Sequence, residues 1–403
     1  MTFRELLEGY KAGTLTDDER YLVEQELEKS EAINDYLAEE IEKSIGYETE
    51  LDCVAANDNV KLEKSIRRTV NRRLATIVAI SVAFVFVINF FIQNIVSPIV
   101  ASKYYDPTKK TGLKYSEDLS FDLRAITEVS MPGYGMTFIS NAENLGFGKY
   151  NLTFTRKNLF TKEKVTVNTQ INKNMRVGSF EDFYVRDYFA FTEFWNAKEG
   201  SDVYKNTLDI QKSFSNTEIE HVREMPSTTY ISAWVRFSKD LSMKELYKVI
   251  ETYKNIEFNW IAIRTAKEQG QQLMGFLTDP NAGMVSSETV DKEKYPGFQM
   301  IDIFGFSGTK NETQFYAYKS NMYETHFTSL IKYLVDHKRA VSALVGNTKN
   351  YDYKSVLDYI NQNGISTYGA LIYGEADDML ELYDSGTIMT FDIDNVLASK
   401  YIQ

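Results

Sequence analysis

The sequence is poor in the residues that build disulfide frameworks and metal sites. Its 403 residues include one cysteine, Cys53, and three histidines, which stand far apart at His221, His326 and His337. One cysteine cannot form an intrachain disulfide, and no Cys or His pair has the spacing of a zinc site. We therefore expect the chain to fold by core packing, without a metal or another cofactor.

Catalytic motifs are also missing. The sequence contains neither the G-x-x-x-x-G-K-[ST] phosphate-binding loop nor the G-x-S-x-G nucleophile turn. Two glycine-containing stretches, GYGMTF and FGFSGTK, are more typical of hairpin corners than of phosphate sites. Glu324 and His326 can form an acid–histidine pair, but no residue near them in the sequence completes a triad. The sequence therefore indicates a protein that is not an enzyme.

Basic residues are scarce in the first part of the chain. Residues 1–60 contain 17 acidic and 5 basic side chains, and the whole chain has a net charge of −12. The acidic excess of the first 60 residues thus accounts for the net charge of the protein. An acidic head on a neutral body argues against direct nucleic-acid binding. It suits a protein partner with a basic surface.

One long run lacks charge altogether. No charged residue lies between Arg73 and Lys103, and Asn89 is the only strongly polar side chain in residues 74–92. A helix needs roughly 20 residues to cross a hydrocarbon core of about 30 Å. The run begins too late for a signal peptide, and its length disfavours a buried helix of a soluble domain. We predict a transmembrane helix over residues 74–98.

The flanks of this run indicate its direction. A basic juxtamembrane segment, residues 66–73, precedes it, whereas Lys103 is the first basic residue after it. Positively charged flanks stay on the cytoplasmic side, so we expect a cytoplasmic N-terminus and an extracytoplasmic region from residue 99 onward. Cys53 then lies in the reducing compartment. The arginines that set this topology are Arg67, Arg68, Arg72 and Arg73.

The head, residues 1–65, has three short helical patterns and is predicted to be all-α. The first pattern ends at Gly13, Thr16 and Glu19 form a capping box for the second, and Ser30 is placed to cap the third. A domain with so small a core is expected to be more stable when bound to a partner than alone. The predicted partner-binding residues are Leu6, Leu7, Tyr10, Leu22, Val23 and Leu27, of which Leu22 and Val23 can instead belong to the core.

The outer region has two parts. Residues 99–225 are expected to be β-rich, because KYNLTFTRK and EKVTVNTQIN alternate apolar and polar residues and helix signals are scarce before about residue 180. Residues 226–403 contain two β-α-β patterns, one with a Ser242–Glu245 capping box and one with Asp377 and Asp378 at a helix start. The sequence predicts an α+β fold, for which a ferredoxin-like arrangement is one form.

Several stretches resemble one family. LLEGYKAGTLTDDERYLVEQELEKSEAINDYLAE is similar to the N-terminal domain of membrane-bound bacterial anti-sigma factors. Glu26, Ser30 and Ile33 stand where that family has a His-x-x-x-Cys-x-x-Cys zinc motif, so the resemblance is to a zinc-free branch. KYYDPTKKTG, DLRAITEVSMPGY, LGFGKYNLTFT and STYGALIYGEADDMLELYDSGTIMTFDIDNV resemble the Firmicutes sigma factor regulator family.

This resemblance implies a single-pass membrane anti-sigma factor. Its head would bind an extracytoplasmic-function sigma factor, and its outer domain would respond to envelope stress. The implied partners are that sigma factor, membrane lipid, and a second membrane regulator or a membrane protease that cuts near SPIVASKYYDPTKKTG. Two alternatives remain open from the residues alone. One is an envelope receptor or adhesion protein with a cytoplasmic anchor, and the other is an ectoenzyme.

Overall fold

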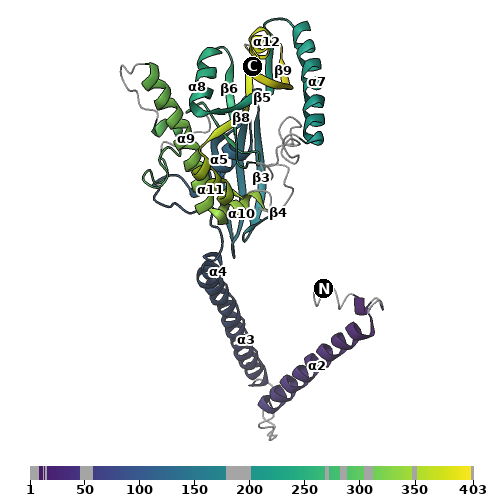
Figure 1. Cartoon of the computed structure of the whole chain (residues 1–403). Coiled ribbons are helices and arrows are strands. Elements are labelled where there is room, and N and C mark those ends of the chain that lie inside the picture. Colours follow the sequence, from purple (N-terminus) through teal and green to yellow (C-terminus); the bar gives the residue numbers. More distant parts are fainter. Residues whose placement is uncertain are drawn as a thin grey trace. The chain divides into compact units, whose positions relative to one another are not determined.

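The computed structural model describes residues 9–11, 13, 16–45, 58–177, 201–267, 272–281, 288–303, 312–346 and 352–400 (Figure 1). The chain divides into two compact units, Met1–Val85 and Phe86–Gln403. The expected residues Leu6 and Leu7, and Cys53, lie outside the described residues.

In the first unit, residues Asp17–Ile45 form a single continuous helix, α2, where two short helices were predicted. The predicted break at Ser30 is wrong. A serine inside a helix costs only a few tenths of a kcal/mol more than the best helix formers, and no glycine or proline stands between Ser30 and Ile45 to stop the helix. Arg20 and Glu24 also pair across one turn at 3.0 Å. The predicted stop at Gly13 is confirmed by its φ of +69°.

Helix α3 (Asp58–Phe91) continues through a π-helical turn, η1 (Ile92–Val96), into α4 (Ser97–Ala101). Within the described residues this is the one helix long and apolar enough to cross a membrane, and its apolar window is fully exposed. Pro98 explains the π turn. It has no N–H for the helical ladder and its ring crowds the preceding turn, and the Ser97 N–H reaches back to the Ile92 carbonyl.

In the second unit, α4 is followed by a buried helix, α5 (Asp118–Ser130), and then by an antiparallel meander of four strands. The expectation that helices are scarce before residue 180 is therefore wrong at α5. The charged residues Asp122, Arg124 and Glu128 interrupt the apolar periodicity of this helix, so the sequence pattern did not indicate a buried helix. In the structure these charged side chains are buried and have polar partners. The meander strands, in the order β1-β2-β3-β4, are β1 (Tyr134–Gly146), β2 (Lys149–Asn158), β3 (Lys164–Asn172) and β4 (Met175–Val177).

The second sheet has the order β7-β6-β8-β5-β9. Strand β8 pairs antiparallel with both β5 and β6, so these two run parallel and α8 connects them. Strand β5 in turn separates β8 from β9, which α12 connects. This is the split β-α-β arrangement of ferredoxin-like folds, with β7 added at one edge. The strands are β5 (Tyr230–Ser242), β6 (Glu257–Ile263), β7 (Gly275–Leu277), β8 (Ser366–Glu375) and β9 (Ile388–Leu397).

Helices accompany this sheet, and Figure 1 shows them distributed around its strands. The predicted Ser242–Glu245 capping box at α8 is confirmed, as is the acidic first turn of α12. Helices α9 and α11 lie between β7 and β8 in the chain. The helix bounds are α7 (Asp202–Glu224), α8 (Met243–Thr252), η4 (Met300–Asp302), α9 (Glu312–Asp336), α10 (Lys338–Val345), α11 (Tyr353–Asn363) and α12 (Ala376–Asp384).

The two sheets share one packed interior. One face of the second sheet carries a cluster of aromatic side chains that includes Trp234, Trp260 and Tyr373, and Phe160 from the β2–β3 turn packs into it. Gly133, in the turn between α5 and β1, approaches the same face so closely that a Cβ would lie 2.9 Å from Leu371 Cδ2. The meander and the ferredoxin-like part therefore pack directly on each other.

Candidate functional site

The predicted partner-binding residues of the head are only partly brought together. Tyr10 is half-buried and its hydroxyl donates to a Glu24 carboxylate oxygen at 3.3 Å. Val23 is fully buried, whereas Leu27 is 41% exposed. Leu22 lies in α2. Val23 therefore serves packing, as was left open for it, and Leu27 remains accessible to a partner.

The second half of α2 carries a group of exposed apolar side chains. Ile33, Tyr36 and Leu37 are exposed by 60%, 63% and 50%. Their spacing of i, i+3 and i+4 places them on one face of the helix. Large exposed apolar side chains that share a face are typical of a surface that binds another protein. This face of α2 is the candidate binding surface of the head.

The four arginines that were predicted to set the topology lie on α3 and are exposed. The Thr76 hydroxyl bonds back to the Arg72 carbonyl at 2.8 Å, so the helix is continuous from the basic segment into the apolar run. A basic segment and an apolar run on one helix fit a membrane anchor.

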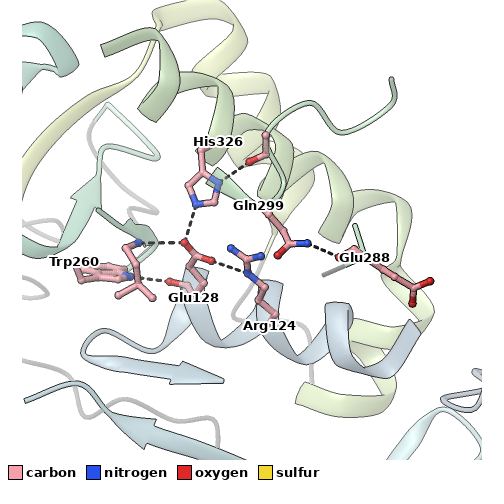
Figure 2. Close-up of polar contacts among 8 residues, drawn as sticks. Arg124, Glu128, Trp260, Glu288, Gln299 and His326 are labelled. Carbon is pink, nitrogen blue, oxygen red and sulfur yellow. Dashed lines mark hydrogen bonds and ion pairs between the residues drawn. The ribbon is translucent and has the colours of Figure 1, made fainter. Parts of the chain in front are cut away.

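In the second unit, a buried carboxylate organises the centre of the fold. Figure 2 shows His326 of α9 and Arg124 of α5 converging on Glu128. The Glu128 carboxylate accepts from His326 Nε2 at 2.7 Å, from Arg124 Nε at 3.3 Å and from the Leu277 N–H at 3.3 Å. The Glu128 carbonyl accepts the Trp260 indole N–H at 2.7 Å. One residue thus joins α5 to α9, β6 and β7.

The protonation of this group follows from its partners. Burial by itself raises the pKa of Glu128, but His326 and Arg124 together outweigh it, and the pKa is lowered from its ordinary value. The other ring nitrogen of His326 faces the Gly297 carbonyl at 2.7 Å. Both ring nitrogens therefore have acceptors, and the ionised carboxylate is balanced by positive charge. The arrangement is that of a buried structural ion pair.

A second buried carboxylate, Asp122, lies six residues before Glu128 on α5. Asp122 accepts from Tyr105 Oη at 2.7 Å and from Tyr333 Oη at 2.9 Å, and it contacts His337 Nδ1 at 3.0 Å. Burial, followed by the charge of Asp122, raises the pKa of both phenols well above the usual range. Both hydroxyls therefore remain donors. Three residues of this group, Tyr105, Asp122 and His337, line a cleft of about 680 Å³, and the lining also includes Asp106, Asp118 and Arg339.

The sequence interpretation missed both carboxylates. It considered Glu324 as the acid for His326, but the acid is Glu128, 198 residues away in the chain. The available signal was the i, i+4 spacing of Arg124 and Glu128, with a further carboxylate at Asp122, in a largely apolar segment. Among the residues that the structure describes, no three His, Cys, Asp or Glu side chains gather as a metal site requires.

Comparison with known proteins bears on the second unit. Residues 222–395 match the family model described as sigma factor regulator C-terminal. The matched range contains all five strands of the ferredoxin-like sheet except the end of β9. No curated protein and no solved structure matches the chain. The C-terminal part of this chain is similar to the C-terminal domain of sigma factor regulators, which supports an anti-sigma factor family and a regulatory rather than a catalytic role.

Proposed function

We propose that the protein is a single-pass membrane anti-sigma factor. In this proposal the cytoplasmic head sequesters an extracytoplasmic-function sigma factor, and the outer domain releases it in response to an envelope signal. The match of residues 222–395 to the sigma factor regulator C-terminal family is the observation that carries the proposal. The membrane-length helix and the acidic head are the further features that such a regulator needs.

Charge and apolar surface support the head as the binding module. Sigma factors bind DNA through basic surfaces, and an acidic module is complementary to such a surface. The exposed face of α2 around Ile33 and Leu37 supplies apolar contacts of the kind that dominate binding energy. Leu6, Leu7, Tyr10, Leu22 and Leu27 remain proposed contacts, and Val23 is proposed to support them from the head's interior.

We assign the head to a zinc-free branch, as in Firmicutes regulators. Glu26 stands at the first position of the zinc motif, and its carboxylate pairs with Lys29 at 2.6 Å. Ile33, at the third position, offers no metal ligand. A zinc-free head has to gain its stability elsewhere, and binding to the sigma factor can supply it.

The signalling step belongs to the segment just after the span. Membrane lipid, a second membrane regulator and a membrane protease are the proposed partners there. Within this segment Ser97, Tyr105 and Pro107 are buried, whereas residues 109–112 are exposed. Proteases cut accessible loops, so residues 109–112 are the proposed cleavage site that frees the head and its sigma factor.

The test is co-purification from membranes. The full chain is solubilised in detergent and tested for retention of a sigma factor from the same organism. The double substitution Ile33→Ser and Leu37→Ser should remove it, because loss of a hot-spot contact costs about 2 kcal/mol, or roughly 30-fold in affinity. The double substitution Glu28→Ser and Asp35→Ser on the opposite face of α2 is the matched control and should retain binding.

Deletion of residues 1–65 supplies the decisive readout in cells. Sigma-dependent transcription should rise when the head is removed. Unchanged transcription, together with no sigma factor recovered by the full chain, would rule out the anti-sigma function.

A further inference from the structure

The tip of the β1–β2 hairpin is attached to the end of the membrane helix. The Phe147 N–H donates to Ser97 Oγ at 2.8 Å, and Ser97 is only 5% exposed. Gly146 has a φ of +85°, and a Cβ there would lie 3.1 Å from Ser97 Oγ and 3.7 Å from Gln93 Oε1. The backbone of the tip can approach the helix this closely because Gly146 has no side chain.

The neighbouring β3–β4 turn is attached to the same place. The Lys173 N–H donates to the Gly148 carbonyl at 2.6 Å, which joins the two turns. Asn174 accepts the Tyr105 N–H at 2.9 Å. Tyr104 packs on Gly148, where a Cβ would lie 3.0 Å from its ring. Both hairpin turns therefore hold the chain where it leaves the helix.

The position of the helix in a bilayer sets the height of these turns. Within the predicted transmembrane helix, residues 74–98, the first nineteen residues, 74–92, rise about 28 Å, which matches a hydrocarbon core of about 30 Å. With this placement Ile92 marks the core boundary, and the residues before it, Phe90 and Phe91, are exposed. Ser97 follows five residues later, a rise of about 7 Å. The headgroup layer of one leaflet is about 5–8 Å thick, so this placement of the span puts Ser97 and the attached tip within that layer.

The side chains at the turns suit such a layer. Leu145 is 43% exposed and Met175 is 72% exposed. Lys103, Lys149 and Lys173 are exposed around them. The carboxylate of Glu143 is also exposed, and it accepts from Asn151 Nδ2 at 3.0 Å. Apolar tips ringed by lysines are typical of surfaces that enter a lipid interface and contact its phosphates.

We propose that the β1–β2 and β3–β4 turns form a second membrane contact, in which Leu145 and Met175 enter the lipid headgroup layer and the lysines bind lipid phosphates. The bilayer surface is thus a fixed support for the second unit, beside the transmembrane helix. The proposal rests on the membrane span and is independent of sigma factor binding.

The test measures depth in the membrane with an environment-sensitive dye. Cys53 is replaced by serine, and single cysteines are introduced by Leu145→Cys and Met175→Cys for labelling with nitrobenzoxadiazole. The full chain is placed in nanodiscs of phosphatidylglycerol and phosphatidylcholine, some containing headgroup-nitroxide lipid. We expect a blue-shifted emission and loss of fluorescence to the nitroxide at both positions.

Glu163→Cys is the matched control. Glu163 is exposed at the opposite end of β2 and β3, about 30 Å from the tip along ten strand residues. Its dye should keep its fluorescence. Equal quenching at Glu163 and Leu145, or no quenching at Leu145 and Met175, would overturn the proposal. The labelled positions are exposed, so substitution there leaves the core intact.

Discussion

At the residue scale, Glu128 illustrates how a buried charge is made tolerable. Its carboxylate is 3% exposed and has His326, Arg124 and the Leu277 N–H as partners. An isolated buried carboxylate would be strongly destabilising, whereas a fully partnered one can hold several elements together. Glu128 therefore works as a structural junction of the second unit.

Removing the charge of Glu128 should show how strongly the stability of the second unit depends on this carboxylate. Glu128→Gln leaves Arg124 and His326 buried without their countercharge, at a cost of about 3–5 kcal/mol in the free energy of unfolding. Denaturant unfolding of the purified protein measures this cost. Glu143→Gln, which changes an exposed carboxylate on β1, is the control and should change stability little.

The same variant should alter the response to acid. The folded pKa of Glu128 lies below its ordinary value of 4.5. Its contribution to stability is therefore fully present above about 4.5 and is lost as the pH falls through the folded pKa. As the pH is lowered through this range, the free energy of unfolding should fall less steeply for Glu128→Gln than for the native protein. An identical slope in both would contradict the role of the ion pair.

Glycine at 133 is required for a different reason, namely close approach. Gly133→Ala combines a φ of +76° with a contact of 2.9 Å to Leu371. Gly112→Ala meets the same backbone strain at φ +73° but has no neighbour within 4 Å. We expect about 1–2 kcal/mol of destabilisation at Gly112 and about 1–3 kcal/mol more at Gly133. Equal losses in thermal unfolding would show that the contact with the sheet is unimportant.

At the scale of elements, local signals decided some helices and failed for others. The start of α8 was predictable because Ser242 and Glu245 satisfy each other's backbone N–H groups within four residues. The continuity of α2 through Ser30 could not be predicted in this way. A residue that can cap a helix marks a helix start only where the preceding helix ends. Helix α5 was not predicted because its charged residues are buried, and their partners, such as His326 and Tyr333, lie about 200 residues away in the sequence.

The capping box of α8 offers a direct test at this scale. Ser242→Ala removes the acceptor for the Glu245 N–H, so the free energy of unfolding should fall by about 1 kcal/mol. Lys244→Ala, an exposed change in the first turn of the same helix, should leave stability nearly unchanged. Chemical denaturation of both variants provides the comparison.

At the scale of the whole molecule, the apolar helix separates an acidic head from a cysteine-free region, residues 99–403. The basic segment before the helix is expected to hold the head in the cytoplasm, and this orientation is a prediction that can be tested. Cys53, the only cysteine, is a natural reporter of the side on which the head lies.

Labelling of Cys53 by a membrane-impermeant maleimide should occur only after cells are lysed. Replacing Arg67, Arg68, Arg72 and Arg73 by glutamine should increase labelling of intact cells, because the positive charge that retains the head is lost. Replacing Lys103, Lys109 and Lys110 by glutamine is the control and should not. Strong labelling of the native protein in intact cells would reverse the proposed topology.

Properties that act over a few residues could be predicted from the sequence by itself. They include the charge-free run, the stop at Gly13, the Ser242–Glu245 capping box and the two β-α-β patterns, since hydropathy, caps and periodicity depend on near neighbours. Only the tertiary structure decided that His326 pairs with Glu128 and that Gly146 meets Ser97. The burial of a charge and the close approach of two backbones depend on residues from distant parts of the chain, which no local pattern brings together.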